Sequence, residues 1–295
     1  MKRFIKHITV FIFVTFIALQ LVSLLSLYFL RQSHFYKPQF VANTLRDVQL
    51  DYVVLGSSTG LTTLNTEQID NETGLKGFNI SVDDTSLSTH YLMLQHFIEN
   101  EGSARSLVLV VSPGDLANGD PSISGNDYRF LPYAHKRYVN RHYVDLPSRE
   151  AAILKVSKYM PFIGVSYYNA ELFYPSLKAA IQPGTRNRFD KNGNYVYPTN
   201  GIAIEKTMRT KELYLTIANP YFEKIKALCD KEQIKLVVYQ PPIYGSEVLG
   251  ETGLLPFVNH SNLLTDPLLF YDRIHVNRKG RIAASRAFAL QLKNL

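Results

Sequence analysis

The sequence predicts an α/β protein: a three-layer sandwich with a central parallel sheet, one N-terminal transmembrane helix and a tyrosine-rich insertion. Three observations predict it. After residue 50, short runs rich in β-branched residues alternate with helical segments, which is typical of a parallel sheet covered on both faces. Before residue 31 the chain contains a long stretch without charge, and between about 116 and 211 the alternation stops.

The N-terminal stretch has the length and flanks of a membrane anchor. Lys2, Arg3 and Lys6 precede the charge-free run Ile8–Leu30, which is about 23 residues long, and about 20 suffice to span a bilayer. The basic flank predicts a cytoplasmic N-terminus and a periplasmic or extracellular domain. The run ends in bulky residues without a small-residue cleavage pattern, which favours an uncleaved single-pass anchor over residues 1–37. A cleaved signal peptide and a buried core helix are the alternatives.

The elements of the α/β domain, residues 38–295, follow from the hydrophobic pattern. The predicted strands are 51–55, 76–80, 107–111 and 235–239, and the predicted helices are 63–69, 87–99, 213–233 and 276–292. Pro220 is expected to kink or restart the third helix. Parallel sheets of this kind place their sites at the carboxyl ends of the strands. Ser58 follows the first predicted strand directly.

The insertion from about 116 to 211 holds ten of the nineteen tyrosines. Asn192-Gly193, between Phe189 and Tyr195, predicts a β-hairpin. The tyrosines could form a binding surface, since each has a flat apolar face and a polar tip. The alternative is that they only pack the insertion against the core.

Composition excludes several classes of function. The net charge is +7, but five positive charges lie in the first 37 residues without an acid; the remaining 27 basic and 25 acidic residues nearly balance, so no nucleic-acid partner is implied. Cys229 is the only cysteine, so neither an internal disulfide nor a cysteine-based zinc site is possible, and a buried thiol is expected. Asp83 and Asp84 are adjacent and expected to meet solvent rather than a metal.

Three residues have the types and the order of a nucleophilic triad. A serine hydroxyl needs a base to take its proton, and the base needs a third group to orient it. Ser58 follows a strand at Gly56-Ser57-Ser58, and Asp272 precedes His275 by three residues just before the last helix. Serine, aspartate and histidine in this chain order form one of the known triads. Ser58 is therefore the predicted nucleophile, His275 the base and Asp272 its orienting group.

These blocks resemble the SGNH (GDSL-like) hydrolase superfamily over about two thirds of the chain. Gly56-Ser57-Ser58 resembles its G-D-S block, Asn79-Ile80-Ser81-Val82 its N-L-G-V block, and Asp272, His275, Asn277 and Gly280 match its D-x-x-H-x-N-x-x-G block. The resemblance implies an SGNH/flavodoxin-like fold and an oxyanion hole formed by the backbone amides of Ser58 and Ser81. It also implies supporting roles for Gly56, Asn79, Gly114 and Asn277, and no metal or other cofactor.

The third block departs from the family pattern. Ser112-Pro113-Gly114-Asp115 places Gly114 where the family usually has an oxyanion-binding asparagine. The anchored domain with its G-S-S block is similar to D-alanine-transfer and polysaccharide O-acetylation proteins, which work beside membrane-bound O-acyltransferases. The resemblance therefore implies an esterase or O-acyltransferase acting on acyl esters of envelope glycans. The alternative is a catalytically weak or inactive binding or scaffold protein with the same fold.

Overall fold

The structure is a computed structural model that describes residues 1–295 except 120–121, 202–203, 205–209 and 294–295. Its contacts divide the chain into two compact units. Unit 1 comprises Met1–Thr44 and Asp127–Asn187, and unit 2 comprises Leu45–Asn126 and Arg188–Leu295. The expected insertion at 116–211 is thus divided: its central part folds with the N-terminal helix, and its flanks belong to the α/β body.

Unit 2 is built on a five-stranded parallel sheet with the strand order β2-β1-β3-β5-β7. The expected α/β class with a central parallel sheet is therefore confirmed. The strands are β1 (Gln49–Leu55), β2 (Gly77–Asn79), β3 (Ser103–Val110), β5 (Lys235–Gln240) and β7 (Phe257–Asn259). A separate parallel pair joins β4 (Lys211–Tyr214) to β6 (Ser246–Leu249).

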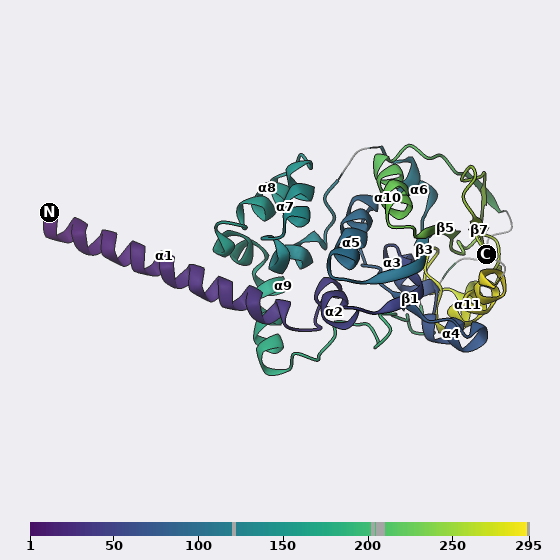
Figure 1. The fold of residues 1–295 in the computed structure, drawn as a ribbon, viewed down its shortest axis with the longest axis horizontal. Coiled ribbons are helices and arrows are strands. Elements are labelled where there is room, and N and C mark those ends of the chain that lie inside the picture. Colours follow the sequence, from purple (N-terminus) through teal and green to yellow (C-terminus); the bar gives the residue numbers. More distant parts are fainter. Residues whose placement is uncertain (120–121, 202–203, 205–209, 294–295) are drawn as a thin grey trace. The chain divides into compact units, whose positions relative to one another are not determined.

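Helices cover both faces of this sheet. Figure 1 shows α5 and α10 on one side of the strands and α4 and α11 on the other. The helices of unit 2 are α3 (Ser58–Thr63), α4 (Thr66–Thr73), α5 (Leu87–Glu99), α6 (Pro113–Ala117), α10 (Pro220–Lys231) and α11 (Arg278–Leu292), with a short 3-10 turn η2 (Pro267–Leu269). The carboxyl-terminal parts of β1 and β3 are buried on both faces, which explains why residues 52–55 and 107–110 read as continuous apolar runs.

The core under α4 and α11 follows from the two-residue repeat of the strands. Tyr52 and Val54 of β1, and Val108 and Val110 of β3, point to the same face and pack against Phe288 of α11. This packing fixes α11 against the sheet. The loop just before α11 therefore has a fixed position beside the carboxyl ends of the strands.

Two expectations about unit 2 were wrong in part, and two strands were not expected. The stretch 213–233 is not helical before Pro220, because its first residues belong to β4. The expected restart at Pro220 is confirmed: Pro220 is the first residue of α10, and Asn219 caps the helix by accepting a hydrogen bond from the amide of Tyr221. Strands β6 and β7 were not expected. Asn192-Gly193 lies in a turn closed by hydrogen bonds to Asp190 and does not join two strands of a β-hairpin. The residues after the turn bond to another segment, since the amide of Tyr195 donates to the carbonyl of Leu61.

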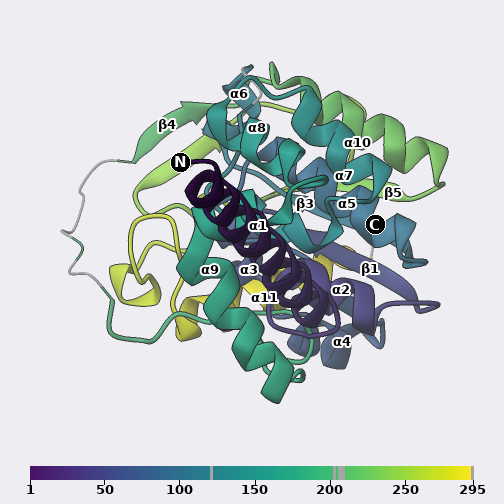
Figure 2. The ribbon, with the colours of Figure 1, turned by 90° about the vertical axis from the view of Figure 1, so that its left-hand side faces the viewer.

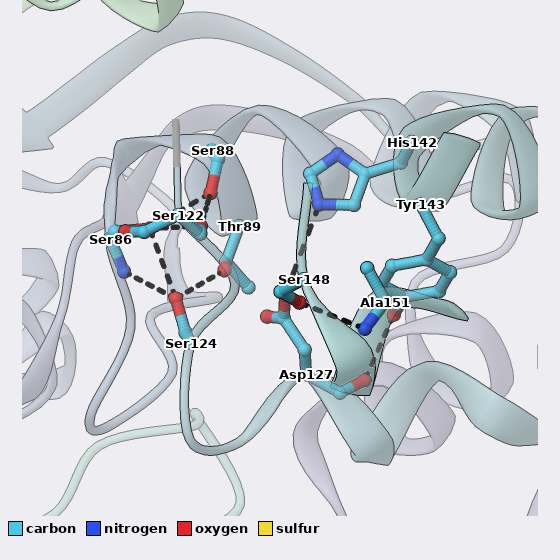
Figure 3. A network of polar contacts seen from close by, with 10 residues as sticks. All are labelled: Ser86, Ser88, Thr89, Ser122, Ser124, Asp127, His142, Tyr143, Ser148 and Ala151. Carbon is cyan, nitrogen blue, oxygen red and sulfur yellow. Dashed lines mark hydrogen bonds and ion pairs between the residues drawn. The ribbon is translucent and has the colours of Figure 1, made fainter. Parts of the chain in front are cut away.

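Hydroxyl groups bind the loop before residue 127 to the amino end of α5. Ser124 Oγ accepts from the amide of Ser86 at 2.9 Å and lies 2.7 Å from Thr89 Oγ1, while Ser88 Oγ donates to the carbonyl of Ser122 at 2.7 Å (Figure 3). These bonds satisfy polar groups of the loop where α5 begins, at the carboxyl edge of the sheet.

Unit 1 is helical. It contains α1 (Lys2–Arg31), α2 (Lys37–Thr44), the 3-10 helix η1 (Asp127–Tyr133), α7 (Arg137–Val144), α8 (Arg149–Val156) and α9 (Pro161–Ile181). Helix α9 is interrupted at Asn169 and packs beside α1 (Figures 1 and 2). Inside the unit, Tyr143 Oη donates to the carbonyl of Asp127, and His142 Nε2 lies 3.9 Å from the carboxylate of Asp127 (Figure 3).

Helix α1 is long and apolar enough to cross a membrane. Its basic residues Lys2, Arg3 and Lys6 flank the apolar part at the amino end, and Arg31 ends the helix. Most of its side chains are exposed in the protein alone. A span of this kind is what the sequence predicted.

Candidate active site

The structure brings Ser58, His275 and Asp272 together at the carboxyl edge of the sheet. His275 Nε2 lies 2.7 Å from Ser58 Oγ, although the two residues are 217 positions apart in the chain. The other ring nitrogen, Nδ1, lies 2.8 Å from Asp272 Oδ2. Both distances are within hydrogen-bond reach, and each ring nitrogen faces one partner. The three predicted residues thus have the geometry that nucleophilic catalysis requires.

A tight loop sets the relative position of Asp272 and His275. Asp272 Oδ1 accepts hydrogen bonds from the amides of Ile274 and His275 at 2.9 and 2.8 Å, which leaves Oδ2 for the imidazole. The amide of Tyr271 donates to the carbonyl of His275 and closes the loop. Because these bonds lie within five consecutive residues, the pair depends little on the rest of the fold.

The same hydrogen bonds set the ionisation of Asp272. Burial of the carboxyl group opposes ionisation, but the hydrogen bonds from the His275 side chain and from the two loop amides outweigh it, so the pKa of Asp272 lies below its ordinary value. The carboxylate is therefore charged at neutral pH. It can orient the imidazole and stabilise the imidazolium that forms when His275 takes a proton.

Asn277 ties this loop to helix α11. Its Oδ1 accepts from the amides of Lys279 and Gly280, as expected of a helix N-cap. Its Nδ2 donates to the carbonyls of Leu268 at 2.9 Å and Phe270 at 3.2 Å. The buried side chain of Asn277 therefore holds both the start of α11 and the segment 268–270, which leads into the loop of Asp272 and His275.

Two glycines are required by close packing at this site. A Cβ on Gly56 would lie 2.9 Å from both Cβ and the carbonyl oxygen of Val110, and a Cβ on Gly280 would lie 2.1 Å from the carbonyl oxygen of Leu269. Gly56 lets the end of β1 approach β3 just before Ser58. Gly280 lets α11 approach the loop that carries His275.

Asn79 supports the turn at Ser58 from the neighbouring strand. Its Nδ2 donates to the carbonyl of Gly60 at 2.9 Å, and Gly60 lies in the helix that begins at Ser58. Its Oδ1 accepts from the amide of Ser81 at 3.0 Å. Asn79 thus connects the end of β2 to the turn that presents Ser58 Oγ.

The Ser81 amide differs from its expected role as an oxyanion donor. It donates to Asn79 Oδ1, and Ser81 is fully buried, so in this structure the donor is already used. The amide of Ser58 is different, because it lies in the first turn of α3 where backbone N–H groups have no intrahelical acceptor. The expectation of an oxyanion donor therefore rests on the amide of Ser58 and not on that of Ser81.

Gly114 lies in α6, directly after β3, and packing does not require a glycine there. A Cβ at Gly114 would find only Ser112 Oγ, at 3.9 Å. Ser112 and Asp115 form a capping box that starts α6 independently of Gly114. The side chain that could have supplied a second oxyanion donor is absent, although the backbone has room for one.

Two tyrosines beside His275 were not identified from the sequence. The ring of Tyr197 lies 5.1 Å from the imidazole of His275 and stacks on Tyr271 at 4.3 Å. Burial, and then the nearby Tyr195, Asp272 and Asp83, raise the pKa of the Tyr197 phenol. Tyr271 adjoins the predicted Asp272, but nothing in the spacing of Tyr197 indicates that its segment lies beside the catalytic loop.

Comparisons with known proteins add no information on the chemistry of this site, which is therefore inferred from its geometry. No model of a known protein family matches the chain, and a comparison with curated proteins gives no match. What the site can do chemically follows from its parts: a hydroxyl paired with a base, a carboxylate behind the base, and a helix-terminal amide beside the hydroxyl.

Proposed function

We propose that this protein is a membrane-anchored serine esterase or O-acyltransferase of the SGNH type. The observation that carries the proposal is the continuous chain of contacts from Ser58 Oγ to His275 Nε2 at 2.7 Å and from His275 Nδ1 to Asp272 Oδ2 at 2.8 Å. A pair of contacts on opposite ring nitrogens also fits a structural role. The position of Ser58 at the first turn of a helix, at the carboxyl end of β1, favours the catalytic one.

The proposed reaction has two steps. Ser58 Oγ attacks the carbonyl carbon of an acyl ester while His275 Nε2 takes the hydroxyl proton, and the backbone amide of Ser58 binds the oxyanion. The C–O bond to the alcohol then breaks, His275 returns the proton to the leaving oxygen, and the acyl group remains on Ser58. In the second step His275 activates the acceptor. Water gives an esterase, and a sugar hydroxyl gives a transferase; neither step needs a cofactor.

The proposed substrate is an acyl ester of an envelope glycan. This part rests on the resemblance of the sequence blocks and on the N-terminal helix, which would hold the domain beside the membrane with its N-terminus in the cytoplasm. A membrane-bound O-acyltransferase is the proposed partner. It would supply the acyl group that Ser58 carries to the glycan.

A second proposal is a binding or scaffold protein with little or no catalysis. Two observations favour it: Gly114 offers no side-chain donor, and the amide of Ser81 is already used by Asn79. Loss of one oxyanion donor costs about 2.7–4 kcal/mol of transition-state stabilisation. The intact triad favours the enzyme.

A fluorophosphonate probe tests the proposal, because such probes react with activated serine hydroxyls. The wild-type protein in detergent is expected to be labelled and Ser58→Ala is not. Ser57→Ala is the matched control: Ser57 is the adjacent serine, and its side chain makes no capping hydrogen bond, so its removal should leave labelling intact. Equal labelling of the wild type and Ser58→Ala would show that another residue reacts and would reject Ser58 as the nucleophile. No labelling of a folded wild type would favour the binding protein.

A further inference from the structure

One face of the second half of α1 is polar and is covered by the rest of unit 1. Ser23 and Ser26 are each only 4% exposed, and Gln20 Oε1 accepts a hydrogen bond from the amide of Phe162 in α9 at 3.4 Å. Residues three apart lie on the same face of a helix. The polar residues of an otherwise apolar run thus face protein, as small and polar residues do where helices pack within membranes.

The other faces of the same segment are apolar and uncovered. Six large side chains between Gln20 and Leu30 have exposed fractions of 38–56%: Leu21, Val22, Leu24, Leu25, Tyr28 and Phe29. In water they would form one continuous apolar surface of a kind that soluble proteins rarely expose. If α1 is a membrane anchor, the hydrocarbon core of the bilayer must therefore extend along the helix as far as Phe29.

Parts of unit 1 lie beside α1 at this level. Gln20 is twelve residues beyond Ile8, where the apolar run begins, or about 18 Å along the helix axis, in a hydrocarbon core about 30 Å thick. Phe162 of α9 contacts Gln20 at this depth, and the ring of Phe162 lies 5.4 Å from the ring of Phe16. The amino end of α9 is therefore at a depth that the bilayer occupies.

The turn between α8 and α9 reaches α1 four to seven residues beyond Gln20, still within the apolar run. Lys158 and Pro161 line one cavity together with Leu24 and Leu27. Tyr159 is 75% exposed, and the Lys158 ammonium lies 5.2 Å from its ring centroid. Tyrosines and lysines of this kind are typical of membrane interfaces, where the ring is amphipathic and the lysine head can extend to the headgroups.

The amino end of α9 also satisfies its own backbone donors. Pro161 has no N–H, the amide of Phe162 donates to Gln20 Oε1, and that of Ile163 donates to the carbonyl of Met160 at 3.0 Å. In hydrocarbon an unsatisfied N–H costs several kcal/mol. A helix start with internal acceptors is suited to an environment without water.

We propose that unit 1 is partly embedded in the bilayer. The turn Val156–Met160 and the first part of α9, up to the break at Asn169, enter the leaflet nearer to the carboxyl end of α1, and lipid acyl chains cover the exposed faces of both helices. The proposal rests on α1 as a membrane anchor but not on catalysis. It makes unit 1 a lipid-contacting body and not a domain held above the membrane.

Tryptophan fluorescence can test it directly, because the chain contains no tryptophan. Three single-tryptophan variants of the full-length protein are reconstituted in phosphatidylcholine vesicles with and without brominated acyl chains. Tyr159→Trp probes the turn, Phe11→Trp probes the first half of α1, and Tyr214→Trp, on an exposed residue of β4 in unit 2, is the control for water. Thermal melting by circular dichroism establishes that each variant is folded.

Bromolipid is expected to quench Tyr159→Trp and Phe11→Trp by at least twofold and to leave Tyr214→Trp unchanged, whereas acrylamide quenches Tyr214→Trp most. Quenching of Phe11→Trp alone would overturn the proposal while keeping the anchor. Quenching of neither would overturn both. If Tyr159→Trp resists bromolipid and acrylamide alike, protein covers the turn, and the lipid assignment is wrong.

Discussion

At the scale of single residues, the site depends on side chains that each hold two parts of the chain. The side chain of Asn277 makes five hydrogen bonds, two from the amides that start α11 and three to the carbonyls of Thr199, Leu268 and Phe270. Asn79 plays the same part for the turn at Ser58. In the proposed reaction such residues act by fixing distances, and their loss should be visible in kcat before it is visible in folding.

Asn277→Ser separates these roles. Serine is also a favourable N-cap, so the start of α11 should persist, but its shorter side chain with a single O–H cannot replace the bonds of Asn277 Nδ2 to the carbonyls before the loop. A displacement of about 1 Å can cost about 10²-fold in rate, so kcat for p-nitrophenyl acetate is expected to fall by about that factor. Unchanged kcat in a folded variant would show that the loop positions His275 without Asn277.

Asp272→Asn should leave the loop intact and still impair the reaction. The amide oxygen can accept from Ile274 and His275 as Oδ1 does now, whereas the amide nitrogen would face His275 Nδ1 and favour the wrong imidazole tautomer. The analogous change in a well-characterised serine protease costs about 10⁴ in kcat. The measurement is kcat at pH 7 beside circular dichroism. A loss of less than tenfold would mean that Asp272 does not orient the base.

Gly114→Asn tests whether the site lacks an oxyanion donor. The Cβ meets only Ser112 Oγ at 3.9 Å, so the side chain has room. If it reaches the oxyanion of the proposed reaction, kcat should rise, by up to about 10²-fold for a well-placed donor. Gly114→Ala, which adds the Cβ without the amide, is the control and should show no rise. Equal rates in the two variants would remove this position from the reaction.

At the scale of elements, the sequence identified those whose signal is local. The carboxyl-terminal parts of β1 and β3 are apolar runs, and α5 has the predicted bounds 87–99. Strands β6 and β7 contain four and three residues, and their pairing with distant partners leaves no local pattern. The start of α10 had a usable signal, because Asn219-Pro220 is an N-cap followed by a proline at the first helical position.

Helix α5 carries a histidine that should make the fold sensitive to acid. His90 is fully buried, neither ring nitrogen has a partner among the residues that the structure describes, and burial lowers its pKa to about 3. Burial likewise lowers the pKa of His260 to about 4. Both lie below the ordinary value of about 6.5. The unfolded chain therefore binds these protons first, and stability is lost as pH falls from about 6.5 toward 4.

His90→Leu should remove half of this effect. Each histidine contributes about 1.4 kcal/mol per pH unit to the slope of the unfolding free energy against pH. The contribution of the pair should therefore fall from about 2.7 to about 1.4 kcal/mol per pH unit. At pH 7 the variant should be as stable as the wild type or more so, because two buried polar atoms without partners are lost. Urea unfolding in detergent at pH 5, 6 and 7 measures both. An unchanged slope would mean that His90 is solvated or paired in solution.

At the scale of the molecule, the sequence predicts that Ser58 and His275 lie together, but it does not predict which segments form each of the two units. Ser58 and His275 could be paired across 217 positions because each lies in a local motif. The association of residues 127–187 with the N-terminal helix has no such motif, since it depends on packing between segments distant in the chain. Tyr197 was missed for the same reason: its contact with His275 follows from where a loop runs and not from its neighbours in sequence.

The two ends of the chain should lie on opposite sides of the membrane. Helix α1 is the one helix within the described part of the chain that is long and apolar enough to span, and Lys2, Arg3 and Lys6 favour the cytoplasm for its amino end. The protein is expressed in bacteria with different epitope tags at the two ends, and spheroplasts are treated with protease. The C-terminal tag should be digested and the N-terminal tag retained. A variant with glutamine at positions 2, 3 and 6 is expected to lose this bias, because the orienting charges are gone. Protection of the C-terminal tag until lysis would reverse the orientation and exclude an envelope ester as the substrate of Ser58.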